Sequence, residues 1–467
     1  MSIRRWLLAL LALALALPAV RAEQNDPRAQ SEALIREQLA HHVGTLAYLW
    51  GYPIVDMSRQ MHNETHRVMA DQPAYAPLNH FHRYEGLMTP DTVGNLRAPN
   101  SDTLYFGGWF DLGNEPVIVR APDTAGRYYT LAITDFFNEV THLGRRTTGT
   151  AEQYFALVGP GFSGTLPAGV KPVPMATQQV WILGRLLVGG AADFPAALAL
   201  VRGFWAAPLS QFSPGMPPSA MPPRQSAAPL DPIGGLEFFS LLDRWLKRNA
   251  ARPDEAALLG LFKQIGIGAG PDFNPQGLDE ASRRGLLQAI KDGQAMLRAS
   301  SQRKLPDVRN GWIFPLGLAD YGHDYLMRAG VAYGGYANRP EESTYAAKTV
   351  DDAGQLMSGA KRYVLHLLPD QLPPAGAFWS LSAYDLQRFT LIENPLRRYS
   401  IGDRSAGLQW NKDGSLDLFI QQTEPPEGRS NWLPVGTEPF SLVLRIYEPA
   451  RSVFDGSYKL APLRERP

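Results

Sequence analysis

The stretch that decides the fold lies near the C-terminus and reads Phe440-Ser441-Leu442-Val443-Leu444-Arg445-Ile446-Tyr447. Every even position carries a large apolar side chain, whereas the odd positions are mixed in character. A period of two is the mark of a half-buried β-strand. Residues 416–421 repeat this alternation. We therefore expect the chain from Tyr363 onward to form strands.

A second strand-rich region lies between about Pro73 and Gly190. Short apolar runs alternate there with Gly, Pro, Asn and Asp, which is typical of strands joined by turns. The runs that predict strands of a largely antiparallel sheet are 116–119, 128–134, 154–158 and 180–183.

Helical periodicity appears at the N-terminus and in the middle of the chain. Leu39, Val43, Leu46 and Trp50 form one apolar stripe, which predicts a helix that ends at Gly51-Tyr52-Pro53. Three further stripes predict helices, and they comprise Phe238, Leu242 and Trp245; Leu258, Leu261, Phe262 and Ile265; and Leu286, Ile290 and Leu297.

These patterns predict a mainly β fold with helices. We expect two β-sandwich or jelly-roll-like domains, an N-terminal helix and a helical segment between the domains. Residues 208–232 contain eight prolines and predict an extended linker or surface loop. The expected boundaries are 23–207 for the N-terminal domain, 208–310 for the linker and helical segment, and 311–467 for the C-terminal domain.

The composition limits the classes of partner and chemistry. The 467 residues are 45% hydrophobic and 19% charged, and Lys+Arg and Asp+Glu balance at 45 each. A formal net charge of zero argues against nucleic acid or an anionic membrane surface as a bulk partner. The absence of cysteine excludes disulfides, thiolate catalysis and cysteine-based metal sites. We expect no cofactor.

The first 22 residues have the pattern of a signal peptide. Arg4 and Arg5 precede an apolar run over residues 6–17, and Pro18 ends it. A small-residue cleavage site ends at Ala22. We expect a periplasmic or secreted protein with no membrane span after cleavage; the alternative is an uncleaved N-terminal anchor.

Two blocks of motifs in fixed order carry a resemblance to a known family. The first block contains 77–79, 98–105, 109–112, 115–117, 126–129, 146–150, 159–161 and 181–185. The second contains 324–329, 378–381, 394–395, 398–404, 413–415, 431–434 and 444–447. Together they resemble the bacterial family of paired domains of unknown function numbered 1254 (N-terminal) and 1214 (C-terminal). The resemblance implies two β-rich domains and implies no particular reaction.

One polar block is the first candidate for a ligand site. Residues 100–105 gather a carboxylate, an amide, two hydroxyls and a phenol. Asn100, Asp102 and Tyr105 could orient a sugar or a hydrated anion, and Asp102 could serve as a general base. The alternative is a turn that enters a strand, with Asn and Asp side chains bonded to their own backbone.

Further candidates follow in the same domain. Arg127, Tyr129 and Asp135 share one strand parity, and Asp135 joins Asp102 and Tyr105 as a candidate catalytic residue. Arg146, beside Arg145, could bind a carboxylate or phosphate in bidentate fashion. The alternative for these charged residues is the rim of a core or structural salt bridges.

The C-terminal half adds aromatic candidates. The residues that suit a carbohydrate or aromatic ligand are Trp379, Tyr384, Trp432 and Tyr447, with Asn431, Asp403, Arg398 and Arg445 near them. The alternative is that the aromatic rings fill the interior of a sandwich. Trp379 and Tyr384 have opposite parity, so they cannot line one face of a regular strand.

Histidine spacing gives two weak metal-site candidates. His62 and His66 are four residues apart, and His80 and His82 are two residues apart. Nothing fixes a third ligand, so we expect no bound metal.

These residues support two functional hypotheses. The first is an exported protein that binds, and could process, a small polar molecule or glycan. The second is a non-catalytic envelope protein that serves assembly or partner binding. A pocket that gathers Asp102, Tyr105 and Arg127 would favour the first, and isolated salt bridges in a filled sandwich would favour the second.

Overall fold

The computed structural model describes residues 27–66, 75–92, 98–217, 222, 225–230, 234–300 and 307–466. The fold is mainly β, with four sheets and several helices, as the sequence predicts. The predicted signal peptide lies outside the described residues. The chain divides into two compact units, one of residues 1–55 and 232–300 and the other of residues 56–231 and 301–467.

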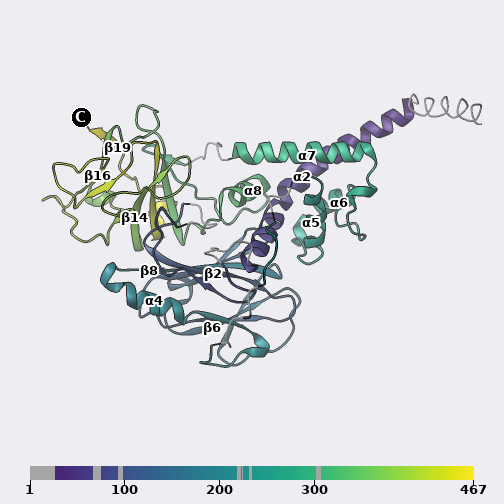
Figure 1. Ribbon diagram of the computed structural model, residues 1–467, viewed down its shortest axis with the longest axis horizontal. Coiled ribbons are helices and arrows are strands. Elements are labelled where there is room, and N and C mark those ends of the chain that lie inside the picture. The colour runs from purple at the N-terminus through teal and green to yellow at the C-terminus, as the bar shows by residue number, and fades with distance from the viewer. Residues whose placement is uncertain are drawn as a thin grey trace, which may run out of the picture. The chain divides into compact units, whose positions relative to one another are not determined.

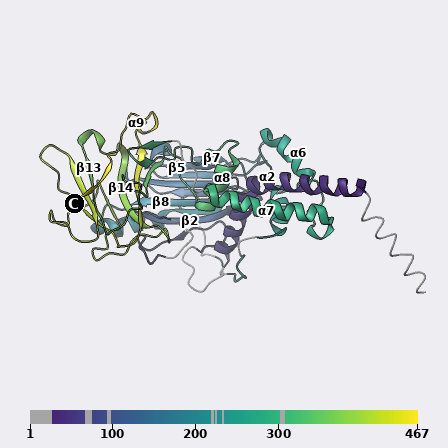
Figure 2. The same ribbon diagram turned by 90° about the horizontal axis from the view of Figure 1, so that it is seen from above.

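The first unit is helical. It contains the first part of α2 (Pro27–Thr65), together with α5 (Glu237–Leu246), α6 (Ala256–Lys263), α7 (Glu280–Ser300) and the short 3-10 turns Pro253–Glu255 and Pro275–Gly277. Helix α7 runs beside α2 (Figure 2). The rings of Tyr48 and Phe238 lie 4.3 Å apart, and Trp50 Nε1 donates to Glu255 Oε1 at 3.1 Å.

Helix α2 corrects one expectation. The predicted end at residues 51–53 is wrong, because the helix continues through Pro53 to Thr65. A proline inside a helix removes one backbone hydrogen bond. Trp50, Ile54 and Met57 on either side of Pro53 are completely buried, and their packing outweighs that loss.

The second unit begins with an N-terminal sandwich of two sheets. One sheet has the order β1 (His82–Arg83), β2 (Thr103–Asp111), β8 (Gln179–Leu187), β4 (Tyr129–Asp135) and β5 (Val140–Gly144). The other has the order β7 (Val170–Pro174), β6 (Gln153–Val158), β3 (Val117–Ala121) and β9 (Trp205–Pro208). The short helices α3 (Arg145–Thr148) and α4 (Phe194–Gly203) complete it. The layers of β2 with β8 and of β6 are separate in Figure 1.

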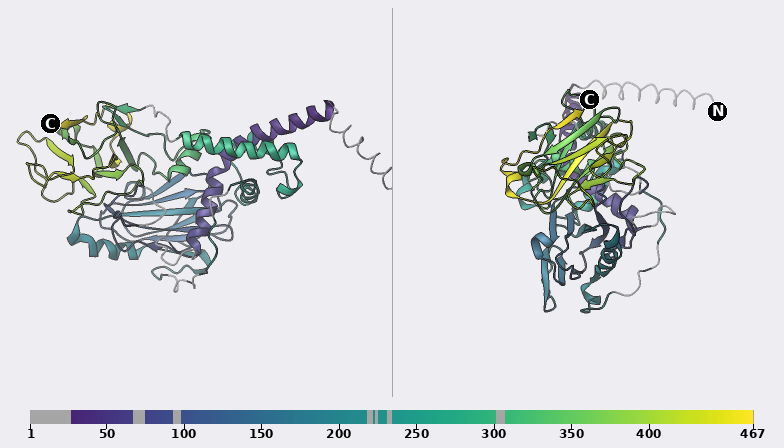
Figure 3. Two further views of the ribbon diagram at one scale, coloured as in Figure 1. Left: turned by 45° about the horizontal axis from the view of Figure 1, so that its top comes forward. Right: turned by 90° about the vertical axis from the view of Figure 1, so that its left-hand side faces the viewer.

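The C-terminal sandwich has the same two-layer plan (Figure 3). Its larger sheet has the order β10 (Val308–Arg309), β11 (Trp312–Ile313), β12 (Ser343–Lys348), β18 (Phe440–Pro449), β14 (Ala375–Asp385) and β15 (Ser400–Gly402). Its smaller sheet has the order β17 (Trp432–Pro434), β16 (Leu416–Gln421), β13 (Arg362–Leu367) and β19 (Leu463–Arg466). Helices α8 (Tyr325–Gly334) and α9 (Arg451–Phe454) flank the strands. The predicted sandwich architecture is confirmed; a jelly-roll connectivity stays a prediction.

Strand parity separates two buried environments in this unit. In β2 and β8 the even residues, such as Phe106 and Ile182, lie in the core of the N-terminal sandwich. In β18 the even residues, such as Leu444, lie in the core of the C-terminal sandwich. The odd residues are buried or half-buried as well, although they point away from both cores. The half-buried strand expected at 440–447 is therefore covered on its second face too.

None of the described helices is both long enough and apolar enough to cross a membrane.

The contact of α7 with α2 can be tested by two glycine substitutions. A Cβ at Gly285 would lie 2.3 Å from the carbonyl oxygen of Glu37 and 2.8 Å from Cβ of Ala40. We expect Gly285→Ala to lower the free energy of unfolding by about 1–3 kcal/mol through overpacking. Gly260 on α6 is the matched control, because no atom lies within 4 Å of a Cβ there. Gly260→Ala should raise stability by about 0.5–1 kcal/mol. Urea unfolding followed by circular dichroism measures both, and equal effects would contradict the close packing.

Candidate functional site

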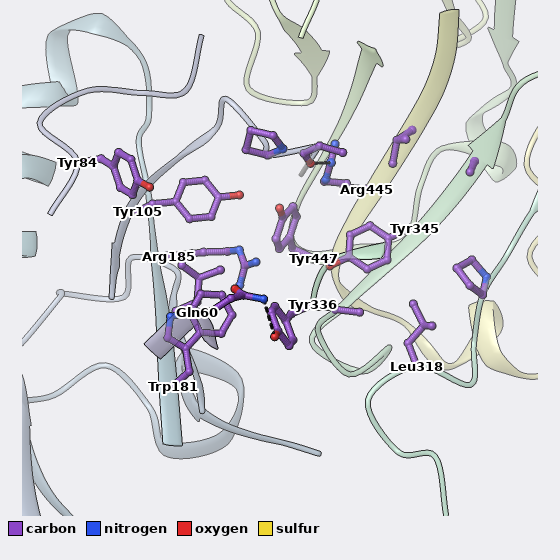
Figure 4. A pocket seen from close by; sticks show the side chains of 18 of the residues that line it. Gln60, Tyr84, Tyr105, Trp181, Arg185, Leu318, Tyr336, Tyr345, Arg445 and Tyr447 are labelled. Atoms are coloured by element: carbon purple, nitrogen blue, oxygen red, sulfur yellow. Dashed lines mark hydrogen bonds between the residues drawn. The ribbon is translucent and has the colours of Figure 1, made fainter. Parts of the chain in front are cut away.

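A cavity of about 300 Å³ lies between the outer faces of the two sandwiches within the second unit. Its walls contain two arginines, several tyrosines and one tryptophan, and Figure 4 shows that they come from both sandwiches. The lining residues used below are Glu64, His82, Tyr84, Ala98, Tyr105, Trp181, Leu183, Arg185, Pro315, Leu318, Tyr336, Tyr345, Ala347, Val443, Arg445 and Tyr447.

Most of the lining residues that lie in strands occupy odd-numbered positions. Tyr105 lies on β2, while Trp181, Leu183 and Arg185 lie on β8. Tyr345 and Ala347 lie on β12, and Val443, Arg445 and Tyr447 on β18. Because side chains alternate between the faces of a strand, the residues that point away from each core point into the cavity.

Arg185 is one of two buried cations in the wall. It is 9% exposed, its Nη1 donates to Asn338 Oδ1 at 2.9 Å, and its guanidinium carbon lies 5.3 Å from the ring centre of Tyr105. Among the described residues, no carboxylate lies within ion-pair distance of it. Among the described residues, the amide oxygen of Asn338 and the phenol of Tyr105 stabilise its positive charge.

Arg445 is the second buried cation and is 4% exposed. Its Nη2 donates to the carbonyl oxygen of Ala98 at 2.7 Å, and its guanidinium carbon lies 5.3 Å from the ring centre of Tyr384. Its Nη1 is buried and has no hydrogen-bond partner in the part of the chain that the structure describes. A buried guanidinium donor without a partner costs several kcal/mol unless a ligand or water satisfies it.

Two asparagines hold the cavity wall in place. Asn100 accepts three hydrogen bonds through Oδ1, from Asp102 N, Thr103 N and Thr103 Oγ1 at 2.9–3.0 Å. Its Nδ2 must therefore be the donor, and it donates to the hydroxyl of Tyr447 at 2.6 Å. The backbone N–H of Asn100 donates to the hydroxyl of Tyr105 at 3.1 Å. One turn thus positions two cavity tyrosines.

Asn338 has the corresponding role on the other side. Its Oδ1 accepts from Arg185, which fixes the orientation of the amide, and its Nδ2 donates to the hydroxyl of Tyr345 at 2.9 Å. The hydroxyl oxygens of Tyr105, Tyr345 and Tyr447 thus accept from the protein, and each phenol keeps its own O–H to donate. Burial raises the pKa of Tyr447 well above its ordinary value, so this phenol stays protonated.

One end of the cavity contains His82, Tyr84 and Glu64. Burial and the neighbouring Arg83 lower the pKa of His82 to about 4, so its imidazole is neutral at physiological pH. Burial and the nearby Glu64 raise the pKa of Tyr84. Glu64 accepts a hydrogen bond from Trp109 Nε1 at 2.6 Å. This end supplies an acceptor nitrogen and a carboxylate, in contrast to the donor-rich remainder.

Asp102 lies outside the cavity lining, in a buried joint between the two sandwiches. Its carboxylate accepts from Ser380 Oγ at 2.6 Å, from Ser400 Oγ at 2.9 Å and from Arg404 Nη2 at 3.0 Å. Of the three residues proposed to gather in one pocket, only Tyr105 lines the cavity.

Arg127, Tyr129 and Arg146 each lie apart from the cavity lining. Arg127 forms a bidentate ion pair with Asp193, whose pKa falls to about 2 because of that hydrogen-bonded pair. Tyr129 packs in the core of the N-terminal sandwich. Arg146 Nε donates to Glu342 Oε2 at 2.8 Å.

Asp135 stabilises the turn between β4 and β5. Its Oδ1 accepts from the backbone N–H of Phe137 at 2.9 Å and of Glu139 at 3.0 Å. Burial raises the pKa of Asp135 to about 7, although these backbone hydrogen bonds and Arg328 oppose the rise. Asp135 lies outside the lining of the cavity.

Two aromatic candidates of the C-terminal half, Trp379 and Tyr384, point to opposite faces of β14, as their opposite parity predicts. Trp379 lies in the core of the C-terminal sandwich, whereas Tyr384 faces the other way and donates to the carbonyl oxygen of Pro99 at 2.7 Å. Trp432 Nε1 donates to the carbonyl oxygen of Gln421 at 2.9 Å. The amide of Asn431 bridges backbone groups of Gln409 and Asp417. Of the candidates in this half, Arg445 and Tyr447 line the cavity.

The histidine pairs do not converge on a third ligand. His80 Nδ1 bonds the carbonyl oxygen of Leu78 at 2.9 Å, while His82 lines the cavity. The rings of His62 and His66 stack 4.5 Å apart. Within the described ranges, no group of three His, Cys, Asp or Glu side chains could hold a metal ion.

Sequence reasoning missed most of the cavity. It did not single out Arg185, Trp181, Tyr336 or Tyr345 as ligand residues. The signal that could have found Trp181, Arg185 and Tyr345 is the polar or aromatic character of odd positions in strands whose even positions form a core, as in 181–185. Tyr336 lies outside the strands, so this signal does not reach it.

Two family matches divide between the sandwiches. Residues 78–208 match the protein of unknown function DUF1254, and residues 342–451 match the protein of unknown function DUF1214. The chain therefore belongs to the family of proteins that pair these two domains, as the resemblance of its motifs predicts. Both matches contribute to the cavity, the first with Tyr105 and Arg185 and the second with Tyr345, Arg445 and Tyr447. No curated protein matches the chain.

One solved structure shows the same fold, and a second is reported beside it. The VPA0106 protein from Vibrio parahaemolyticus aligns with a TM-score of 0.69 at 22% sequence identity, over 92% of this chain and 100% of that one. A putative uncharacterized protein from Burkholderia cenocepacia aligns with a TM-score of 0.41 at 14% identity, over 95% of this chain and 89% of that one. The first likeness supports the fold only.

The contribution of the buried joint at Asp102 to stability can be tested by substitution. Asp102→Asn removes the charge of a carboxylate that is only 6% exposed, and it puts an amide N–H group where Ser380, Ser400 or Arg404 now donates. We expect a loss of about 1.5–3 kcal/mol in the free energy of unfolding. Asp193→Asn is the matched control, because Asp193 and Arg127 are 26% and 21% exposed and such pairs contribute about 0–1 kcal/mol. Chemical denaturation measures both variants. A stable Asp102→Asn protein would show that the joint does not depend on this charge.

Proposed function

We propose that the protein binds a small polar molecule in the cavity between its two sandwiches. The observation that carries this proposal is Arg445, a buried cation of the cavity wall whose Nη1 has no hydrogen-bond partner among the described residues. Buried polar groups in proteins almost always have partners, so an exception inside a cavity favours a ligand or ordered water there. A cavity of about 300 Å³ lies at the small end of ligand sites.

A second candidate function is assembly or partner binding without a small ligand. It is favoured by the joint around Asp102, where a polar motif of the sequence serves to connect the sandwiches. The two candidates differ in one respect that can be measured. Only the first requires that the cavity be open to an added molecule.

Filling the cavity tests the first candidate. Val443→Phe adds a ring that points into the cavity from β18, whereas Val364→Phe adds the same ring on β13, outside the lining. We expect a thermal-shift screen across sugars, organic acids and aromatic compounds to give hits with the unchanged protein and with Val364→Phe. Those hits should disappear with Val443→Phe. A ligand at a hundred times its Kd raises stability by about 2.7 kcal/mol, which is readily detected. Hits that survive in Val443→Phe would place binding elsewhere.

We further propose that the protein is exported and acts in the periplasm or outside the cell. The basis is the sequence of residues 1–22, with two arginines, an apolar run and a cleavage site near Ala22. Intact-mass measurement of protein from a periplasmic fraction should show a chain that begins at or near Glu23. A chain that keeps Met1 to Ala22 in a membrane pellet would overturn this proposal.

A further inference from the structure

We propose that the ligand is a small organic acid, whose carboxylate is bound by the guanidinium groups of Arg185 and Arg445. This inference rests on the proposed function and adds the chemical class of the ligand. It is carried by three features of the cavity, namely two buried arginines that pair with no carboxylate among the described residues, free hydroxyl donors and an apolar wall.

The first feature is charge. Several other arginines of the same unit are balanced by carboxylates, such as Arg146 by Glu342 at 2.8 Å and Arg404 by Asp102 at 3.0 Å. Arg185 and Arg445 are more deeply buried, yet no carboxylate among the described residues pairs with either. A buried cation is stabilised by an anion in contact with it. A ligand carboxylate would supply the missing charge.

The second feature is the set of hydroxyl donors. Tyr105, Tyr345 and Tyr447 already accept hydrogen bonds from Asn100 and Asn338, so the free capacity of each phenol is an O–H that donates. Together with the guanidinium groups of Arg185 and Arg445, this region of the wall is rich in donors. A carboxylate only accepts, so it matches this region, whereas an ammonium group would meet donors and positive charge.

The third feature is the remainder of the wall. Leu183, Val443, Pro315 and Leu318 supply apolar surface, and Trp181 supplies an aromatic face. The carboxylate of Glu64 is engaged by Trp109 at the end near His82 and Tyr84. The ligand that matches both regions has one acidic head and an apolar body.

Matched pairs of compounds test the class without any variant. Calorimetric titration of the full chain would compare benzoate, hexanoate and succinate with benzamide, hexanamide and succinamide, and would add phenyl phosphate and glucose. We expect at least one acid to bind at least tenfold more tightly than its amide. Equal or tighter binding of the amides, of phenyl phosphate or of glucose would overturn the carboxylate assignment and leave the proposed function standing. Binding by no compound would contradict the proposed function itself.

Substitution of the two arginines tests whether they cause the preference for acids over amides. Arg445→Gln and Arg185→Gln keep hydrogen-bond donors and remove the charge, and each should reduce the acid-to-amide ratio at least tenfold. Arg127→Gln removes a charge outside the cavity and should leave the ratio unchanged. If Arg445→Gln fails to fold, the comparison of acid with amide in the unchanged protein still decides the class. An unchanged ratio in both folded cavity variants would overturn the inference.

Discussion

The hydrogen-bonded joint around residues 100–102 is the constraint on which the second unit depends. Asp102 accepts from Ser380, Ser400 and Arg404, and Asn100 donates to Tyr447. These bonds connect the start of β2 with β14, β15 and β18, strands that lie about 300 residues away in sequence. Buried charged and amide groups are stabilised by the hydrogen bonds that their partners supply, so the joint depends on these contacts. The outer faces of the two sandwiches are thereby held together.

Once the two outer faces are held together, a cavity between them is a consequence of shape and side-chain size. Twisted sheets that meet through their outer faces cannot touch everywhere, and the odd residues of β2, β8, β12 and β18 line the space that remains. Large side chains such as Tyr105, Tyr345 and Trp181 make it small and give it directional groups. The pairing of the two family domains in one chain acquires a physical reason here, because neither domain alone encloses the cavity.

Much of the fold could be predicted from the sequence, because its determinants are local. Alternation at 440–447 and the apolar runs before residue 190 predict strands, and the stripe at 286–297 predicts helix α7. The predicted end of α2 was wrong, because packing around Pro53 outweighs the tendency of proline to end a helix. The site was harder to predict. The sequence singled out Arg445 as a ligand residue but did not single out Arg185. Whether either arginine lines a cavity depends on strands of the other domain, and residue spacing does not reveal that contact.

The turn at Asn100 shows why a motif can be essential to a site without contacting a ligand. Its composition is that of a turn, and Asn100 indeed bonds the backbone of Asp102 and Thr103. Those bonds consume the carbonyl oxygen of the amide, so only its N–H group can reach Tyr447. The phenol oxygen of Tyr447 is then occupied as an acceptor, and its O–H is left to donate. Turn geometry thus sets the polarity of the cavity wall: exchanging the amide for an acceptor would reverse the direction of the hydrogen bond and turn the hydroxyl of Tyr447 away from any anion.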